Sequence, residues 1–403
     1  MADILDSVAE FQGLYGPFTV AERVLQKIWL HRDFDSTHAR LADGRTLEIV
    51  SPGEWNLLGG PDFRGARLRI GGREVCGDVE VHFHAADWRA HGHPANPNFQ
   101  AVVLHVVLFP PEEFERPALR SDGEGMPTLI LLPLLHRDLE EYAADDALEA
   151  ITARDEWRRF AELGKKPQSE IQSLLREHAL ARWRQKVHFA RLRIAKLGWT
   201  EAAHQTALEI LGYRRNRAAM LTLAARYPLA AWAGGLEAAQ LYAEVPLLWQ
   251  LQGVRPANHP RTRLAQYAAW VRACPDWPAR LVALAGELPV GEPVAEATVG
   301  EARRKLSLQN SRERLARAIT GETVGGTRFD TLVCDGFLPL TAAQAGCDLS
   351  AAWFCWFIGD VPLAVRRAMP RLGVAGSRKQ PLCHGFGQGL LGWILEQKED
   401  ASA

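Results

Sequence analysis

Two acidic residues and a histidine at one end of a predicted β-hairpin have the types and spacing of a metal-dependent hydrolytic site. Pro61-Asp62-Phe63 stands at the start of one strand, and Glu80-Val81-His82 lies in the next. If the hairpin pairs Asp62 with Glu80, the two carboxylates can hold Mg²⁺ or Mn²⁺, which prefer oxygen ligands. His82 would then orient or deprotonate the attacking water. The pattern therefore predicts hydrolysis assisted by a divalent ion.

Strand alternation predicts which side chains share a face with this pair, because successive side chains point to opposite faces of a sheet. The polar residues that share one face are Asp78, Glu80, His82 and His84. The apolar residues on the other face are Val79, Val81 and Phe83. A solvent-facing polar side of an antiparallel sheet would give the same pattern. The glycines in the loop before Asp62 favour a site, because they allow a ligand to approach the backbone closely.

A crowd of histidines in the same segment offers a second kind of site. The histidines that could ligate an ion are His82, His84, His91 and His93. Imidazole nitrogens suit Zn²⁺ or Fe²⁺ better than Mg²⁺. His105 stands inside an apolar strand, and we expect it to be a hydrogen-bonded core histidine. A His-ligated metal site is therefore the alternative to the carboxylate site.

Possible contacts to a nucleic-acid substrate come from two places in the chain. Asn56 and His84 lie close enough in sequence to the acidic pair to contact a scissile phosphate. Residues 151–200 carry twelve Lys and Arg against five Asp and Glu. This basic stretch, which includes Arg182, Arg184 and Lys186, is predicted to grip a DNA or RNA backbone; a solvated helix face is the alternative.

The elements that must position these residues form an α+β unit in the first third of the chain. Apolar side chains at helical spacing predict a helix over residues 18–31. Asp43-Gly44 predicts a tight turn before a first strand. Further strands are predicted over residues 66–70, 75–84, 101–109 and 128–135, with Gly71-Gly72 closing the hairpin. We expect a mixed sheet with flanking helices over residues 1–145 and a mostly α-helical region over residues 146–403.

Several function classes lose their usual sequence support. The six cysteines are scattered singly, which argues against a zinc ribbon or a disulfide framework. The P-loop, the GxSxG elbow and the HExxH helix are absent, and the GxGxxG match at residues 387–392 has no strand before it. No apolar run approaches the length of a membrane span, and the N-terminus begins with acids. We therefore expect a cytoplasmic protein without a membrane partner; nothing indicates its oligomeric state.

The order of these elements resembles the core of the PD-(D/E)xK nucleases. A helix, a strand, a strand that begins at Pro61-Asp62 and a strand carrying Glu80-Val81-His82 follow one another, and a further strand completes the set. The resemblance implies a restriction-endonuclease-like sheet in which Asp62 and Glu80 hold Mg²⁺, and it adds Glu22 on the first helix as a third ligand. His82 stands where these nucleases carry Lys, so a catalytically inactive module that binds nucleic acid or protein is also compatible with the pattern.

Five longer segments resemble a bacterial family of unknown function, number 2851. They are WNLLGGPDFRGARLRIGG, GDVEVHFHAADWRAHGH, VVLHVV, RPANHPRTRLAQ and GFGQGLLGW. We expect the likeness to extend from near residue 22 to near residue 393, over most of the chain. The resemblance implies membership of this family, and it implies no activity.

Overall fold

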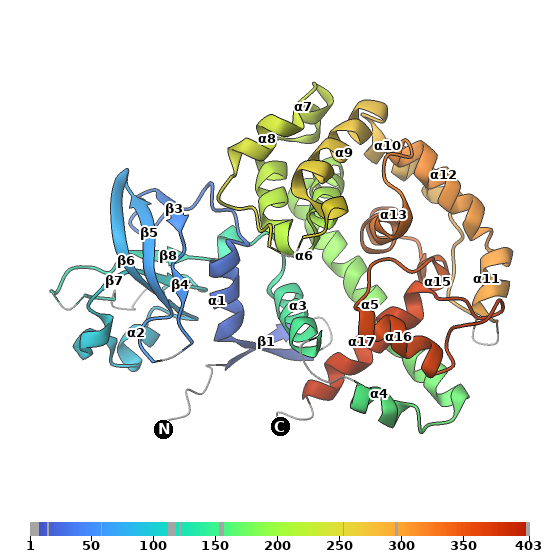
Figure 1. The fold of residues 1–403 in the computed structure, drawn as a ribbon, viewed down its shortest axis with the longest axis horizontal. Helices are drawn as coiled ribbons and strands as arrows, with labels where there is room; N and C mark the ends of the chain where they lie inside the picture. Colours follow the sequence, from blue (N-terminus) through green and yellow to red (C-terminus); the bar gives the residue numbers. More distant parts are fainter. Residues whose placement is uncertain are drawn as a thin grey trace. The chain divides into compact units, whose positions relative to one another are not determined.

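The chain forms two compact units in a computed structural model. The structure describes residues 8–13, 16–57, 59–111, 118–120, 122–152, 157–252, 254–294 and 297–399. Unit 1 comprises Met1–Ala143 and Val245–Gln250, and unit 2 comprises Ala144–Glu244 and Leu251–Ala403. Figure 1 shows that the strands belong to the first part of the chain and that helices make up the rest.

Unit 1 contains a small sheet of two strands and a mixed sheet of six. The strands are β1 (Val8–Gly13), β2 (Gly16–Ala21), β3 (Leu47–Ser51), β4 (Glu54–Trp55), β5 (Phe63–Ile70), β6 (Arg73–His82), β7 (Val102–Val107) and β8 (Thr128–Ile130). The larger sheet has the order β3-β5-β6-β7-β8, with β4 also paired to β5. The pairs β3–β5 and β5–β6 are antiparallel, whereas β6–β7 and β7–β8 are parallel. The predicted mixed sheet is therefore confirmed.

The β5–β6 hairpin sets the register of the candidate site. Gly71 and Gly72 have φ values of 55° and 83°, so both central residues of the turn adopt the left-handed conformation that glycine tolerates. Phe63 pairs with Val79, with a register shift between Phe63 and Ala66. The residue before β5 is Asp62, which the pairing brings opposite Glu80.

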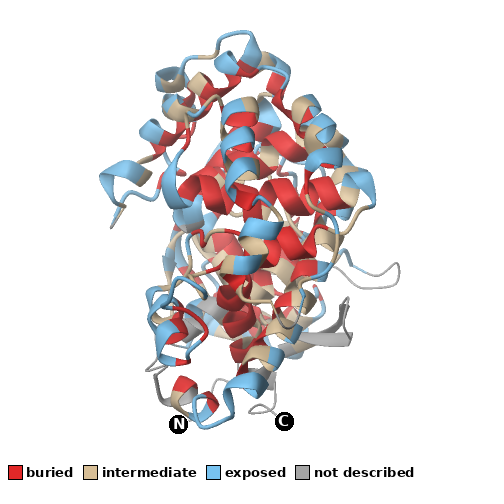
Figure 2. Ribbon diagram, turned by 90° about the vertical axis from the view of Figure 1, so that its right-hand side faces the viewer, coloured by how far each residue is buried: buried red, intermediate tan, exposed pale blue. Residues whose placement is uncertain are grey.

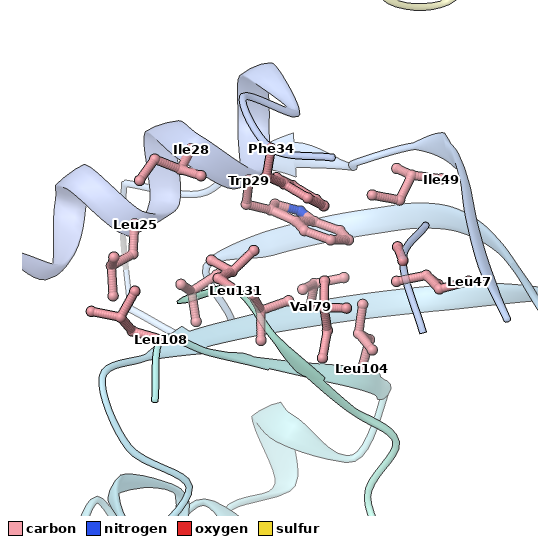
Figure 3. Close-up of a cluster of buried hydrophobic side chains, with 14 of the residues drawn as sticks. Leu25, Ile28, Trp29, Phe34, Leu47, Ile49, Val79, Leu104, Leu108 and Leu131 are labelled. Carbon is pink, nitrogen blue, oxygen red and sulfur yellow. The ribbon is translucent and has the colours of Figure 1, made fainter. Parts of the chain in front are cut away.

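The main core of unit 1 lies between the sheet and α1 (Glu22–His31). In Figure 3, Leu25, Ile28 and Trp29 of this helix lie over sheet residues that include Val79 and Leu104. Phe83 also belongs to this core, as does Val81. Because side chains alternate along β6, Glu80 and His82 must point to the opposite face.

The N-terminal boundary of the first helix differs from the prediction. The apolar spacing predicts a helix from residue 18, but residues 16–21 form β2, which pairs with β1, and the helix begins at Glu22. Thr19 and Val20 are β-branched and favour a strand. The prediction for residues 128–135 was also too long, because β8 ends at Ile130 and a 3₁₀ turn, η3 (Leu132–Leu134), follows.

Unit 2 is helical in its described residues. The α-helices after the sheet are α3 (Leu139–Thr152), α4 (Trp157–Leu163), α5 (Gln168–Leu197), α6 (Trp199–Arg226), α7 (Leu229–Ala233), α8 (Ala238–Glu244), α9 (Pro260–Ala273), α10 (Trp277–Ala283), α11 (Val299–Lys305), α12 (Leu308–Thr320), α13 (Gly326–Thr331), α14 (Leu338–Ala345), α15 (Ser350–Cys355), α16 (Leu363–Arg371) and α17 (His384–Glu399). Shorter segments are η4 (Pro256–Asn258), η5 (Leu284–Glu287) and the π-helix η6 (Leu332–Phe337). Many residues of these helices are buried, as the red segments in Figure 2 show. The predicted α+β fold class, with a mostly helical C-terminal region, is confirmed.

None of the described helices combines the length and the apolar character needed to cross a membrane.

Candidate functional site

Asp62 and Glu80 are neighbours, as the hairpin register requires. The main-chain N–H of Asp62 donates to Oε2 of Glu80 at 3.0 Å, and the N–H of Val81 donates to Oδ2 of Asp62 at 3.0 Å. The side-chain amide of Gln26, on α1, donates to Oδ1 of Asp62 at 2.7 Å. Both Asp62 oxygens therefore accept protein donors, and these bonds tie the turn before β5 to α1 and β6.

The polar face of β6 is buried at its C-terminal end. Glu80 is 5% exposed and His82 is 1% exposed, so the solvent-facing alternative for these two residues is wrong. Two segments that cover them are α2 (Asp87–Ala90) and η1 (His93–Ala95), whose Trp88 and His93 are also buried. Burial raises the pKa of Glu80 to about 8, partly offset by the N–H of Asp62. A carboxylate this deeply buried needs a positive partner to remain charged at neutral pH.

Two imidazoles lie against Glu80, and a third lies against one of these two rings. Nε2 of His82 lies 3.2 Å from Nδ1 of His91, 3.4 Å from Nε2 of His93 and 3.4 Å from Oε1 of Glu80. Nε2 of His93 lies 3.3 Å from the same Glu80 oxygen. We call Glu80, His82, His91 and His93 the histidine–glutamate cluster. It joins residues that the sequence analysis had divided between two rival sites.

Spacings of this size are those of atoms that share one metal ion. Ligand atoms bound at about 2.0–2.1 Å in tetrahedral geometry lie about 3.3–3.4 Å from one another. The spacings to Nε2 of His82 and Oε1 of Glu80, between 3.2 and 3.4 Å, match this edge length. A donor set of three imidazoles and one carboxylate fits Zn²⁺, Fe²⁺ or Mn²⁺ and fits Mg²⁺ poorly, because Mg²⁺ demands oxygen ligands.

The imidazoles of His82 and His93 have the protonation state that metal binding requires. Burial lowers the pKa of His82 well below its usual value, and the neighbouring His105, His93 and His91 lower it further. Burial also lowers the pKa of His93 to about 4. Both rings are therefore neutral at pH 7 and keep a nitrogen lone pair for an ion.

His105 contacts the ring nitrogen of His82 that faces away from the other cluster residues. It is fully buried on β7, opposite Glu80 in the β6–β7 pairing, and its Nε2 lies 2.9 Å from Nδ1 of His82. The prediction of a hydrogen-bonded core histidine is confirmed. Burial, with a smaller contribution from His93, lowers the pKa of His105 to about 3, so it too is neutral. Metal-binding histidines usually hydrogen-bond in this way through the ring nitrogen that faces away from the ion.

The other predicted residues of unit 1 lie at different distances from the cluster. Oε1 of Glu22, the first residue of α1, is 3.9 Å from Nε2 of His82, and the side chain is buried. His84 is exposed, stacks on Phe109 and is not grouped with the other three histidines as a possible ligand. Asn56 braces the loop instead: its side chain donates to the carbonyl of Pro61 at 2.9 Å, and its N–H donates to that of Asp62.

The predicted basic residues of α5 belong to unit 2 and do not form a common face. Arg182 and Lys186 are one helical turn apart, and each is engaged inside the unit. Nε of Arg182 donates to Gln388 at 2.7 Å, and Nζ of Lys186 lies 2.8 Å from Asp335. Arg184 is exposed. Two of the three charges are thus committed to partners on α17 and η6, so the charge excess overstates the surface available to a phosphate backbone.

Sequence reasoning missed that the carboxylate and histidine sites are one site. The available signal was the pair of motifs Glu80-x-His82 and His91-x-His93, which are separated by a short polar segment. Because that segment folds into α2 and η1, His93 lies beside Glu80 and His82 of β6. Its ring stacks on the ring of Phe99, with the two ring centres 3.8 Å apart.

Comparison with protein families places the site in a family context. Residues 22–243, more than half of the chain, match the family described as "Protein of unknown function (DUF2851)". The matched range includes the histidine–glutamate cluster and ends before residues 255–266 and 385–393. Neither the curated proteins nor the solved structures give a match. The chain belongs to the DUF2851 family.

Proposed function

We propose that this chain is a metal-dependent hydrolase whose ion is held by the histidine–glutamate cluster. The observation that carries the proposal is that Nε2 of His82 lies 3.2–3.4 Å from a donor atom of each of three residues, at the spacing of ligands that share an ion. These residues are His91, His93 and Glu80, and Oε1 of Glu80 also lies 3.3 Å from Nε2 of His93. Zn²⁺, Mn²⁺ or Fe²⁺ suits this set. In this proposal His82 is a metal ligand and not the base that the sequence predicts, because its Nε2 lies among the other donor atoms.

The surroundings of the cluster favour catalysis over a purely structural ion. His91 is exposed whereas His82 and His93 are buried, so the cluster is accessible from the His91 side. Glu22 adds a second carboxylate 3.9 Å from His82 and is the candidate to hold or accept a proton of a reacting water. A divalent ion held in this cluster would polarise a bound substrate oxygen and acidify water.

The substrate class that we propose is a phosphodiester of DNA or RNA. Its support is the element order: α1, the antiparallel strands β3, β5 and β6, and then the parallel strand β7. This is the order in which the PD-(D/E)xK resemblance implies a nuclease core, with Asp62 and Glu80 at the equivalent places. This support is a likeness in the order of elements, and the chemistry must be tested on the site itself.

The experiment is a cleavage assay on single- and double-stranded DNA and RNA with added Zn²⁺, Mn²⁺ or Mg²⁺. We expect cleavage that depends on a transition metal and is lost in Glu80→Gln. Glu74→Gln, an exposed change on the same strand β6, should cleave like the parent. Tight metal binding without turnover on any of these nucleic acids would remove the nuclease proposal. Binding of nucleic acid that weakens with salt would then favour the inactive module.

A further inference from the structure

A pocket of about 80 Å³ lies within unit 2. Helices α5, α11, α15 and α17 all contribute side chains to it, and α15 packs against the other three. The lining residues on which the inference depends are Gln172, Arg176, Phe354, Cys355, Gln380 and Phe386. The pocket shares no residue with the histidine–glutamate cluster, so it is a second candidate site.

Arg176 is the charged residue of this pocket. No other charged side chain is found among the described residues that line it. The buried Nε of Arg176 has no hydrogen-bond partner, and its guanidinium forms no ion pair, in the part of the chain that the structure describes. The guanidinium carbon lies 5.7 Å from the centre of the Phe354 ring. The pocket therefore holds a cation that lacks a counter-charge and has N–H groups free to donate.

The other polar groups of the pocket are neutral. Gln172 lies one helical turn before Arg176 on α5, so the two side chains share a face of the helix. Oε1 of Gln380 accepts the N–H of Val299 at 3.1 Å, which leaves the NH₂ group of Gln380 to donate to a ligand. Burial raises the pKa of the Cys355 thiol to about 12, so this residue adds no negative charge. Amide donors thus accompany the guanidinium, as an anionic ligand requires.

Two phenylalanine rings form an apolar wall beside these donors. The rings of Phe354 and Phe386 are buried, and their centres lie 5.1 Å apart in an edge-to-face arrangement. Gly385 permits this arrangement, because a Cβ at that position would clash with the ring of Phe354. Gly389, one turn further along α17, lies against the carbonyl of Leu175, next to Arg176 in the chain. The glycines of α17 therefore hold the apolar wall close to the guanidinium.

We infer that this pocket binds a small carboxylic acid, with its carboxylate on Arg176 and its hydrocarbon part against Phe354 and Phe386. The planar fork of a guanidinium matches a carboxylate through two parallel hydrogen bonds. One cation balances one monoanion, whereas a phosphate dianion would leave a negative charge unbalanced beside the aromatic rings. This site lies in unit 2 and does not depend on the proposed hydrolase activity.

The volume of the pocket limits the size of the acid. An apolar cavity of about 150 Å³ admits benzene. A pocket of about 80 Å³ therefore encloses less than a benzene ring, which corresponds to a short aliphatic chain. Butyrate has a carboxylate and a chain of this kind, and butyramide has nearly the same shape without the charge.

The test is an NMR titration of the full chain with butyrate, butyramide and inorganic phosphate at constant ionic strength. We expect saturable binding of butyrate, and binding of butyramide that is weaker by about tenfold or more, because hydrogen bonds to a charged group are lost. Arg176→Gln should weaken butyrate binding by a similar factor. Arg191→Gln removes the same charge from an exposed position of α5 and should bind butyrate like the parent.

Urea unfolding of each variant separates loss of the site from loss of the fold. Arg176→Gln should unfold like the parent, because the guanidinium has no ion pair among the described residues. If it does not fold, Arg176→Lys keeps the charge, removes the fork and should still weaken butyrate binding.

Three results would overturn the inference. The first is a parent chain that shows no saturable binding of butyrate. The second is butyrate binding that is unchanged in Arg176→Gln, or in Arg176→Lys where the first variant does not fold. The third is binding of butyramide or of inorganic phosphate that is as tight as that of butyrate, because the pocket would then not select a carboxylate.

Discussion

The main-chain N–H of Asp62 donates to one carboxylate oxygen of Glu80, so the two oxygens of Glu80 have different partners. Oε2 accepts the N–H of Asp62 at 3.0 Å, while Oε1 lies 3.3–3.4 Å from the Nε2 atoms of His93 and His82. One oxygen is thus anchored to the turn and the other faces the imidazoles. The anchor does not require the Asp62 side chain, so the two acids can be separated by mutation.

Glu80→Gln and Asp62→Asn should differ in metal affinity. Loss of a residue that only hydrogen-bonds to a metal ligand typically weakens metal binding by about 10- to 100-fold. Glu80→Gln removes a ligand itself and should weaken Zn²⁺ or Mn²⁺ binding by more than this. Asp62→Asn disturbs the bond to the N–H of Val81 and should lower the free energy of unfolding by about 1–3 kcal/mol, with a smaller effect on metal affinity. Metal titration and urea unfolding measure the two effects. Equal loss of metal in both variants would make Asp62 a ligand, as the sequence analysis first predicted.

His105→Phe should weaken metal binding although His105 lies behind the cluster. If His82 uses Nε2 for the ion, its Nδ1–H donates to Nε2 of His105, 2.9 Å away. Phenylalanine fills the space but cannot accept this bond, so we expect about 10- to 100-fold weaker metal binding. His105→Gln supplies an acceptor and should restore part of the affinity. A Phe variant that binds metal like the parent would show that this contact does not orient His82.

The fold was largely readable from local patterns. The Gly71-Gly72 turn, the alternation along β6 and the long helical period of α5 are all local, and each element is present. The start of α1 was missed because β2 depends on pairing with β1, which no local pattern reveals. Likewise, β8 is shortened by a 3₁₀ turn at Leu132–Leu134.

The site was only partly predictable, for a physical reason. The register of one hairpin is enough to bring Asp62 beside Glu80. His93 comes next to Glu80 only because two short helices form and its ring stacks on Phe99. His82 is buried only because other segments pack over the face of the sheet opposite α1. The inward direction of Arg182 and Lys186 depends on α17 and η6, which are distant in sequence. Charge counting alone cannot detect such partners.

Gly389→Ala should destabilise the packing of α17 against α5. A Cβ at Gly389 would lie 2.0 Å from the carbonyl oxygen of Leu175, which is backbone and cannot move aside cheaply. Overpacking of this kind costs about 1–3 kcal/mol or more. Gly387→Ala is the matched control, because its Cβ would meet nothing closer than 3.6 Å. Thermal and urea unfolding should separate the two variants; equal stability would contradict the tight helix contact.

His204 should make the stability of unit 2 depend on pH. It is fully buried, and its Nε2 lies 3.0 Å from the carbonyl oxygen of Tyr227, so this nitrogen must carry the proton. Nδ1 then accepts the hydroxyl of Tyr267 at 2.6 Å. Burial lowers the pKa of His204 to about 4. The folded protein therefore keeps this ring neutral where the unfolded chain, with a pKa near 6.5, takes up a proton.

The stabilisation from a neutral His204 is complete above pH 6.5 and is lost as the pH falls toward 4, up to about 3 kcal/mol. His204→Gln should flatten this part of the curve. Urea unfolding at a series of pH values between 7 and 4 measures the difference between parent and variant. Parallel curves would show that His204 has the same pKa in the folded and the unfolded state.

Metal titration of His91→Ala and His84→Ala tests the central claim most directly. Both histidines are exposed, so neither change should greatly affect folding, but only His91 belongs to the histidine–glutamate cluster. After removal of any metal with a chelator, the parent chain should bind one Zn²⁺ or Mn²⁺ per molecule. His91→Ala should bind the ion more weakly, and His84→Ala should match the parent. A parent chain that binds no stoichiometric ion, or equal behaviour of the two variants, would contradict the metal site.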